Sequence, residues 1–213
     1  MKSHMKFIIR IKNQWYQMFR FYLLFHLILF SISMKCAFAQ EDLSIFDLQV
    51  KKWAEECNKE ATVELEMLLS SGRLSIGQLF DTFYIPIPNT DPQKFHTQYD
   101  KYSDEMLQII LDKYLEKDKN ILFVVIVDVN GYLPTHNRKY SKSLTGDQQT
   151  DLLNNRTKRM FNDKTGLAAA RNTNPYLMQK YSRDTGETMI DLSVPVFIRE
   201  KHWGAIRFGY LEK

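Results

Sequence analysis

Residues 121–136 have the sequence ILFVVIVDVNGYLPTH, an apolar run followed by a turn signal and a second short extended segment. Its first nine residues are almost all apolar and rich in β-branched side chains, which predicts a buried β-strand over 121–129. The Asn130-Gly131 pair that follows is typical of a two-residue hairpin turn, because both residue types accept a positive φ. We therefore expect a second strand over 132–136, paired with the first.

Three more extended segments follow near the C-terminus, and their apolar and polar residues alternate as in a half-buried sheet. They are 176–183, 187–198 and 203–211. Turns over 184–186 and 199–201 connect them, so the three strands should form an antiparallel meander. A helical insertion over 147–161 separates this meander from the strands of 121–136.

The N-terminal half has the periodicity of helices. Asp42 or Ser44 can cap a first helix that runs to about residue 69, where Ser71-Gly72 ends it. A second helix is expected over 74–83, an extended segment over 84–92, and a third helix from Pro92 onward. The predicted class is α+β: long N-terminal helices over 40–120, then an antiparallel sheet of about five strands with a helical insertion over 121–213, in one domain.

The first 39 residues differ from the rest of the chain. Basic residues precede an apolar run over 21–34, and the small residues Ala37 and Ala39 come after it. This order is typical of a secretory signal peptide, so we expect cleavage near Ala39 and a periplasmic or secreted protein. The alternative is a membrane anchor formed by residues 19–34, a short segment for a bilayer that needs about 20 apolar residues.

Charge and cysteine content argue against several classes of protein. Without residues 1–39 the chain has 23 basic and 25 acidic residues, a net charge of −2, so the sequence pI of about 8.9 belongs largely to the leader. We therefore expect no nucleic-acid binding. Cys57 is the one cysteine of residues 40–213, and its helical context predicts a small buried side chain. An intermolecular disulfide is the alternative.

Five segments resemble a family of known sensors. They are 84–90 (YIPIPNT), 127–137 (VDVNGYLPTHN), 155–161 (NRTKRMF), 166–172 (GLAAARN) and 202–207 (HWGAIR). Together they are similar to the periplasmic PAS-like or single-Cache sensor domain of methyl-accepting chemotaxis proteins. The resemblance implies a fold that senses small ligands. The sequence has no counterpart of the signalling output region of such receptors, so we expect any signal to pass through a partner protein.

Arginines in the 137–175 segment are the first candidates for ligand binding. If the expected helix continues to residue 161, Arg156 and Arg159 lie one turn apart on the same side. Two guanidinium groups there could hold a carboxylate or a phosphate in a bidentate manner. Arg171 and Asn137 belong to the same segment, which we expect to fold over one face of the sheet. The alternative is that these arginines are solvated or paired with acids such as Asp191.

Other candidates lie on the predicted strands. Asp191 has the opposite register to its apolar neighbours and could receive a ligand ammonium, or it could be a solvent-facing strand acid. Tyr132 and Tyr181 could stack on a ligand or line the edge of the core. His136 ends the second predicted strand and has no partner at metal-binding spacing, so a structural role is the stronger interpretation.

The sequence has no P-loop, Gly-x-Gly-x-x-Gly or Gly-x-Ser-x-Gly motif, and no Cys-x-x-Cys-His motif for haem attachment. We therefore expect no enzyme, no cofactor and no metal. The expected partners are a small molecule, either a carboxylate or an amino acid, a second copy along the first helix, and a membrane signalling protein. The alternatives are a structural or interaction protein that keeps the fold without a ligand, a sensor holding haem through His136 or His202, and a small secreted enzyme.

Overall fold

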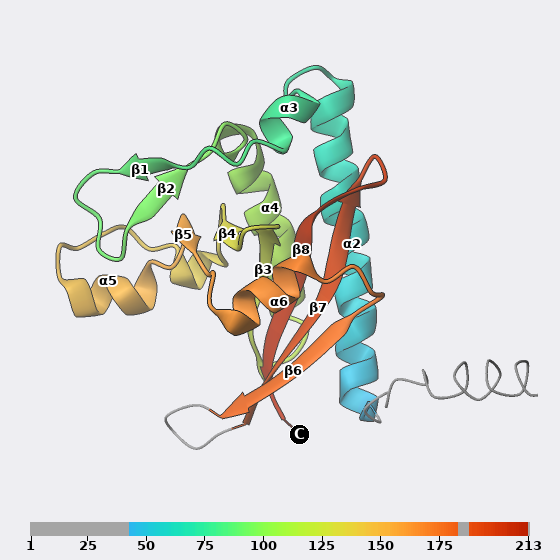
Figure 1. Cartoon of the computed structure of the whole chain (residues 1–213). Coiled ribbons are helices and arrows are strands. Elements are labelled where there is room, and N and C mark those ends of the chain that lie inside the picture. Colours follow the sequence, from blue (N-terminus) through green and yellow to red (C-terminus); the bar gives the residue numbers. More distant parts are fainter. Residues whose placement is uncertain (1–42, 183–187, 213) are drawn as a thin grey trace, which may run out of the picture. The chain divides into compact units, whose positions relative to one another are not determined.

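A four-stranded antiparallel sheet with the order β3-β8-β7-β6 forms the centre of the fold (Figure 1). The computed structural model describes residues 43–182 and 188–212. The strands of this central sheet are β3 (Ile121–Asp128), β6 (Leu177–Ser182), β7 (Thr188–Ile198) and β8 (Lys201–Leu211). The predicted C-terminal meander is thus confirmed, while its expected turn over 184–186 lies outside the described residues.

The turn between β7 and β8 is tight. Arg199 and Glu200 both have positive φ values, 48° and 63°, the backbone of a hairpin turn that follows the twist of the strands. The two strands continue in antiparallel register from this turn to Met189 and Leu211. The pair β7–β8 is therefore the long centre of the sheet.

Two helices cover one face of the central sheet. The long α2 (Ile45–Ser70) packs along β7 and β8, and α4 (Asp100–Leu115) packs against β3 and α2 (Figure 1). Small side chains at Ala54, Cys57 and Ala61, all fully buried, let α2 approach the sheet closely. The main hydrophobic core lies between these helices and side chains of the sheet such as Ile126 and Phe208.

The ends of α2 agree with the sequence. Ser44 is the N-cap, and it forms a capping box in which its hydroxyl accepts from the backbone N–H of Asp47 while Asp47 accepts from the N–H of Ser44. Tyr210 on β8 donates its hydroxyl to the same carboxylate at 2.6 Å, so the cap is tied to the sheet. The helix ends at Ser70 with Ser71 as its C-cap, before Gly72 at a φ of 70°. Cys57 is buried in this helix, as predicted.

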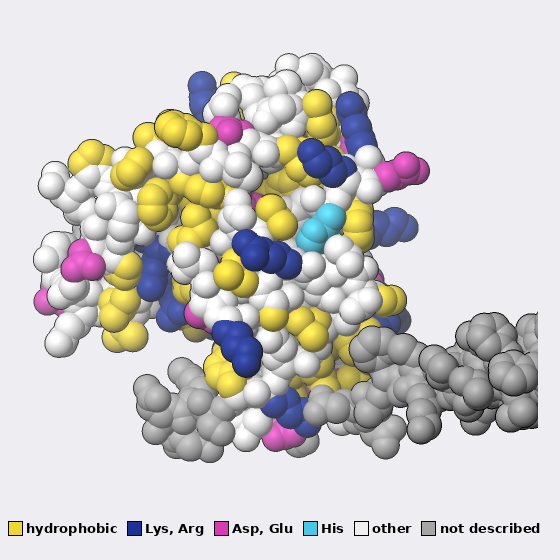
Figure 2. Space-filling model, in the orientation of Figure 1, with side chains coloured by type: hydrophobic (Ala, Val, Ile, Leu, Met, Phe, Trp, Pro, Cys, Tyr) yellow, Lys and Arg dark blue, Asp and Glu magenta, His cyan; other side chains and the backbone are white. Residues whose placement is uncertain are grey.

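The opposite face of the central sheet carries the helix α6 (Lys164–Arg171) and a smaller hydrophobic cluster. The cluster is formed by buried Val125, Val127, Leu133, Ala170 and Ala205, with Phe123 and Phe161 packed against it. A second four-stranded antiparallel sheet has the order β1-β2-β5-β4. Its strands are β1 (Ile85–Ile87), β2 (Lys94–His96), β5 (Arg159–Met160) and β4 (Tyr132–Leu133). Apolar side chains, among them those of Phe83 and Ile85, are exposed in this part of the molecule (Figure 2).

Two sheets with eight strands replace the expected single sheet of about five, and the expected hairpin over 121–136 is the main error. The turn at Asn130-Gly131 is present, but β4 pairs with β5, and β3 pairs with β8. The Asp128 side chain explains this, because its Oδ1 accepts from the N–H groups of Asn130 (2.9 Å) and Tyr132 (3.0 Å) and draws the chain away from the central sheet. Gly131, with a φ of 82°, lies so close to the backbone of Phe161 that a Cβ atom there would clash.

The second and third predicted helices are shorter than expected, unlike α2. The second is the four-residue α3 (Ile76–Leu79), and the third begins at Asp100 and not at Pro92, because residues 94–96 pair as β2. The insertion has the short η1 (Arg138–Tyr140) and α5 (Gln148–Asn154). Its helix ends at Asn154, since Asn155 leaves the helical conformation and forms a β-bridge to Ser141.

Within the described part of the chain, every helix is either too short or too polar to cross a membrane.

Candidate functional site

A cavity of about 330 Å³ lies on the face of the central sheet opposite α2, beneath the segment of residues 133–165. Its walls are largely apolar, formed by Phe123 and Val125 from β3, Leu133 from β4, and Phe161 after β5. A polar set completes the lining: His136, Arg156, Asp163, Thr165, Tyr181 and Arg207. This volume is at the lower end of the range of about 300–1,000 Å³ that ligand sites occupy, so the cavity fits a small molecule.

A second hollow, of about 470 Å³, adjoins the first near α5. The two share Phe123, His136, Arg156 and Tyr181. Its other walls include Tyr140 and Leu153. Arg156 and His136 therefore lie between the two spaces and face whatever enters either of them.

Burial keeps the His136 ring neutral. The side chain is 3% exposed, and its ring packs edge-on against Tyr140 at a centroid distance of 4.7 Å. Burial and then the positive charge of Arg156 lower the pKa of this imidazole well below its ordinary value. The Nδ1 atom accepts from the backbone N–H of Asn137 at 2.7 Å, so the proton of the neutral ring is on Nε2. The ring is thus an uncharged hydrogen-bond donor.

Arg156 follows α5 in a short extended segment that is held from several sides. Its backbone N–H donates to Tyr140 O at 2.7 Å, and its guanidinium lies over the Phe161 ring at 5.6 Å. The side chain is half-buried and lines both spaces. Arg156 therefore places a permanent positive charge at the edge of an apolar cavity.

The floor of the cavity carries a buried ion pair. Asp191 on β7 is fully buried, and the Arg207 guanidinium on β8 meets it through Nη2–Oδ2 at 2.5 Å and Nε–Oδ1 at 3.4 Å. Burial alone would lower the pKa of Arg207, but the neighbouring Asp191 carboxylate raises it. The two charges compensate each other, so Asp191 is not the solvent-facing acid that the sequence allowed.

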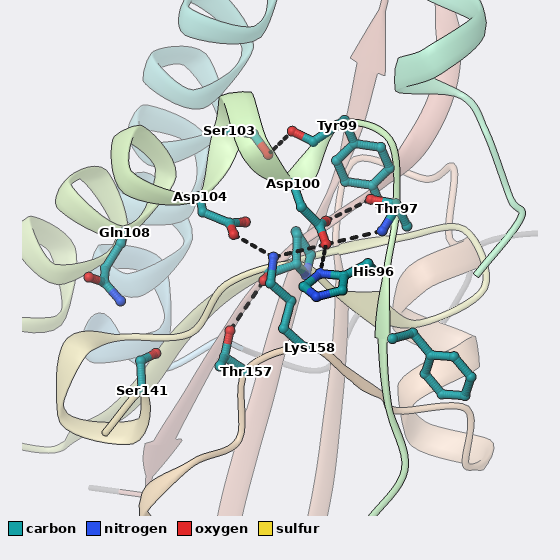
Figure 3. A network of polar contacts seen from close by, with 12 residues as sticks. His96, Thr97, Tyr99, Asp100, Ser103, Asp104, Gln108, Ser141, Thr157 and Lys158 are labelled. Carbon is teal, nitrogen blue, oxygen red and sulfur yellow. Dashed lines mark hydrogen bonds and ion pairs between the residues drawn. The ribbon is translucent and has the colours of Figure 1, made fainter. Parts of the chain in front are cut away.

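A polar network at the start of α4 holds the residues after Arg156, within the segment of residues 133–165 that lies over the cavity (Figure 3). Lys158 Nζ makes an ion pair with Asp100 at 2.9 Å and another with Asp104. The Tyr132 hydroxyl lies 2.8 Å from Asp100 Oδ2. Burial raises the pKa of Asp104 to about 6, against the opposing effect of Lys158. These contacts tie the residues after Arg156 to a helix of the main core.

Three of the predicted site residues come together at the cavity: His136, Arg156 and Tyr181. The other five do not line it. Arg159 lies in β5, where its Nη1 is buried without a hydrogen-bond partner and burial lowers its pKa. Arg171 is exposed at the end of α6, and its Nε donates to Val129 O.

The remaining predicted residues have structural roles. Tyr132 is fully buried in the network around Asp100. Asn137 is also fully buried, and its Oδ1 accepts from the N–H of Val124 at the edge of the central sheet. The expectation that Arg156 and Arg159 share one helical face is wrong, because α5 ends before both of them.

Sequence reasoning missed Arg207, Asp163 and Thr165. Arg207 lies opposite Ser193 and on the same face of the sheet as Asp191, so the exact register of the last two strands is the signal that identifies it. Asp163 is the N-cap of α6 and accepts from the N–H groups of Thr165 and Gly166, both at 3.0 Å. An aspartate shortly before the Ala168–Ala170 run is a helix-start signal in the sequence.

No protein-family model and no curated protein matches the sequence. Among solved structures, the chain is similar to an extracellular ligand-binding receptor from Desulfohalobium retbaense. The sequence identity is 14% and the TM-score is 0.36, and the match covers 72% of this chain and 24% of the receptor chain. It is also similar to the sensory domain of the Campylobacter jejuni chemoreceptor Tlp3, solved with isoleucine bound, with 16% identity, a TM-score of 0.36, and coverage of 76% and 60%. The chain thus spans less than two thirds of either protein.

Proposed function

We propose that this protein is an extracytoplasmic sensor or binding module of the PAS or single-Cache type, which takes a small organic anion into the cavity beneath residues 133–165. The observation that carries the proposal is the pairing of apolar walls with Arg156 and a neutral His136 donor at the edge of the same space. A carboxylate suits this edge, since an arginine can hold it with two parallel hydrogen bonds.

The walls favour an apolar body on the ligand. Phe123, Val125, Leu133 and Phe161 offer no hydrogen-bonding side chains, so a polar molecule would lose its hydration there without replacement. An alkyl or aromatic group would be transferred from water at a gain of about 25 cal/mol per Å² of buried apolar surface. The ligand class is therefore a small monocarboxylate with a hydrocarbon part, and amino acids with apolar side chains fall within it.

Binding is a better proposal than catalysis. Among the described residues, Cys57 is the free thiol, and it lies in the core on the other face of the sheet. His136 is a poor base, because burial lowers its pKa and its Nδ1 is occupied by the backbone. Asp163 is engaged as the cap of α6. No group in the described lining is arranged as a nucleophile beside a base.

The proposal includes the location and the partners expected from the sequence. The leader-like segment of residues 1–39 supports export, or anchoring by residues 19–34, with the binding domain outside the cytoplasm as part of the proposal. A membrane signalling partner and a second copy are proposed along α2. This helix exposes several large apolar side chains: Ile45, Leu48, Val63 and Met67.

Thermal unfolding of the purified full-length protein tests the proposal. Hexanoate is compared with hexanamide, which has nearly the same shape without the charge, and with free leucine as a zwitterion. A ligand present at about 100 times its dissociation constant adds roughly 2.7 kcal/mol of stability. We expect stabilisation by hexanoate or leucine, little by hexanamide, and loss of this preference in Arg156→Met. Absence of stabilisation by every carboxylate and amino acid in a broad screen would reject the proposal and favour a structural or interaction role.

A further inference from the structure

A buried lysine lies directly behind Arg156. Lys94 on β2 is 5% exposed, and its ammonium group donates to Asn155 O at 3.0 Å, Asn155 Oδ1 at 2.7 Å and Thr157 O at 2.6 Å. All three N–H donors of the ammonium are thereby used. Two of the three acceptors are the backbone carbonyls of the residues on either side of Arg156.

We propose that Lys94 is a positioning residue of the ligand site, whose ammonium group holds the backbone on both sides of Arg156 and so fixes the guanidinium at the edge of the cavity. The inference deepens the proposed function and rests on it for the binding readout. Lys94 itself does not line the cavity, so its effect on a ligand must pass through Arg156.

The surroundings show why this lysine is an unusual anchor. Its ammonium is held by neutral oxygens, and no carboxylate of residues 43–182 or 188–212 makes an ion pair with it. Arg159, across the strand pair, places a second positive charge beside it, and burial and then Arg159 lower the pKa of Lys94 to about 8, against the opposing effect of the Asp151 carboxylate. Burial and the charge of Arg159 both destabilise the ammonium, and its hydrogen bonds all go to Asn155 and Thr157. We infer that its role is to hold this segment.

We call the hydrogen bonds of Lys94 on both sides of Arg156 the clamp. Two further contacts hold the same segment, residues 155–158. The N–H of Lys158 donates to Leu133 O at 2.9 Å, and the Asn155 amide donates to Lys142 O at 2.6 Å. These bonds attach the segment at its ends, while Lys94 is the one side chain in the described structure that spans Arg156 itself. Loss of the ammonium would leave the Asn155 and Thr157 carbonyls without this donor and let the Arg156 backbone move.

The first test is binding of hexanoate and hexanamide by the full-length protein with Lys94→Met, with Lys119→Met as a matched exposed-lysine control. If Lys94 positions Arg156, Lys94→Met weakens hexanoate about ten- to a hundredfold, as expected for loss of hydrogen bonds to a charged group, and changes hexanamide binding little. In an Arg156→Met background the same substitution has no further effect on hexanoate. Equal weakening of both compounds, or full additivity with Arg156→Met, would overturn the proposal.

The second test needs no ligand. Amide hydrogen exchange should show a tenfold or larger loss of protection at Arg156 and Lys158 in Lys94→Met, with protection of the β7–β8 core unchanged. Unchanged protection at these two amides would overturn the clamp, whatever the binding result. If Lys94→Met does not fold, Lys94→Gln keeps two N–H donors and is used for the same comparisons. Failure of the wild-type protein to bind hexanoate counts against the proposed ligand class only, because exchange still decides the clamp.

Discussion

Breaking the ion pair between Asp191 and Arg207 is the perturbation whose effect the structure fixes best. In Asp191→Asn the side chain keeps its shape, but the guanidinium, 8% exposed as a residue, loses its counter-charge at the floor of the cavity. In Arg207→Met the opposite happens, and a fully buried carboxylate is left alone. Each single change leaves one uncompensated charge in an apolar environment.

The expected magnitude follows from desolvation. Removal of one partner of a buried pair costs about 3–5 kcal/mol, whereas replacing both partners by apolar side chains of similar volume is about neutral or stabilising. Since total stabilities are about 5–15 kcal/mol, each single variant loses a large part of the free energy of unfolding. For a domain of this size the loss corresponds to a decrease in Tm of roughly 6–20 °C.

The assay is urea unfolding of the wild type, Asp191→Asn, Arg207→Met, and the double variant Asp191→Leu/Arg207→Met, all at pH 7. We expect both single variants to be strongly destabilised and the double variant to lie within about 1–2 kcal/mol of the wild type. Lys180→Met, on the surface of β6, serves as a control for removal of a charge in an exposed pair. Single-variant losses below about 1 kcal/mol, or a double variant whose loss equals the sum of both, would show that the two charges do not compensate each other in a buried pair.

Three further predictions concern single side chains. The pKa of buried His136 is well below its unfolded value of about 6.5, so the unfolded state alone gains a proton as the pH falls below 6.5. The free energy of unfolding of the wild type should therefore fall by up to about 1.4 kcal/mol per pH unit relative to that of His136→Gln. Unfolding measured between pH 7 and 5 checks this. Equal slopes for both proteins would contradict a neutral buried ring. Gly204→Ala should destabilise the fold by more than about 1 kcal/mol in denaturant unfolding, since its Cβ would meet Val127 O at 2.0 Å; an unchanged midpoint would show that β3 and β8 are farther apart. Cys57 should not react with a thiol reagent in the native state but should react in denaturant, because burial raises its pKa; fast native labelling would mean that α2 opens.

The parts of the fold that depend on local signals could be predicted from the sequence. The Ser44 cap and the Gly72 stop bound α2, and strict alternation defined the strands that became β7 and β8. Both patterns act within a few residues and follow from backbone geometry.

The errors arose where long-range contacts override local patterns. Lys94 pairs in β2 and reaches residues 155–157, so the chain after Pro92 cannot continue the helix that its composition favours. The Asp128 carboxylate accepts hydrogen bonds from the backbone N–H groups of Asn130 and Tyr132, and β4 pairs with β5 in the second sheet. The Asn-Gly pair alone does not indicate this pairing. The same reason separated the candidate site residues: Arg156 reaches the cavity because α5 stops early, while Arg159 enters β5.

A crystal structure of the full-length protein with hexanoate, or with the carboxylate that stabilises it most, is the decisive test of the ligand site. We expect the carboxylate within hydrogen-bond distance of the Arg156 guanidinium and His136 Nε2, with the alkyl chain against Phe123 and Phe161. A cavity filled by its own side chains, or a ligand bound away from Arg156, would contradict it.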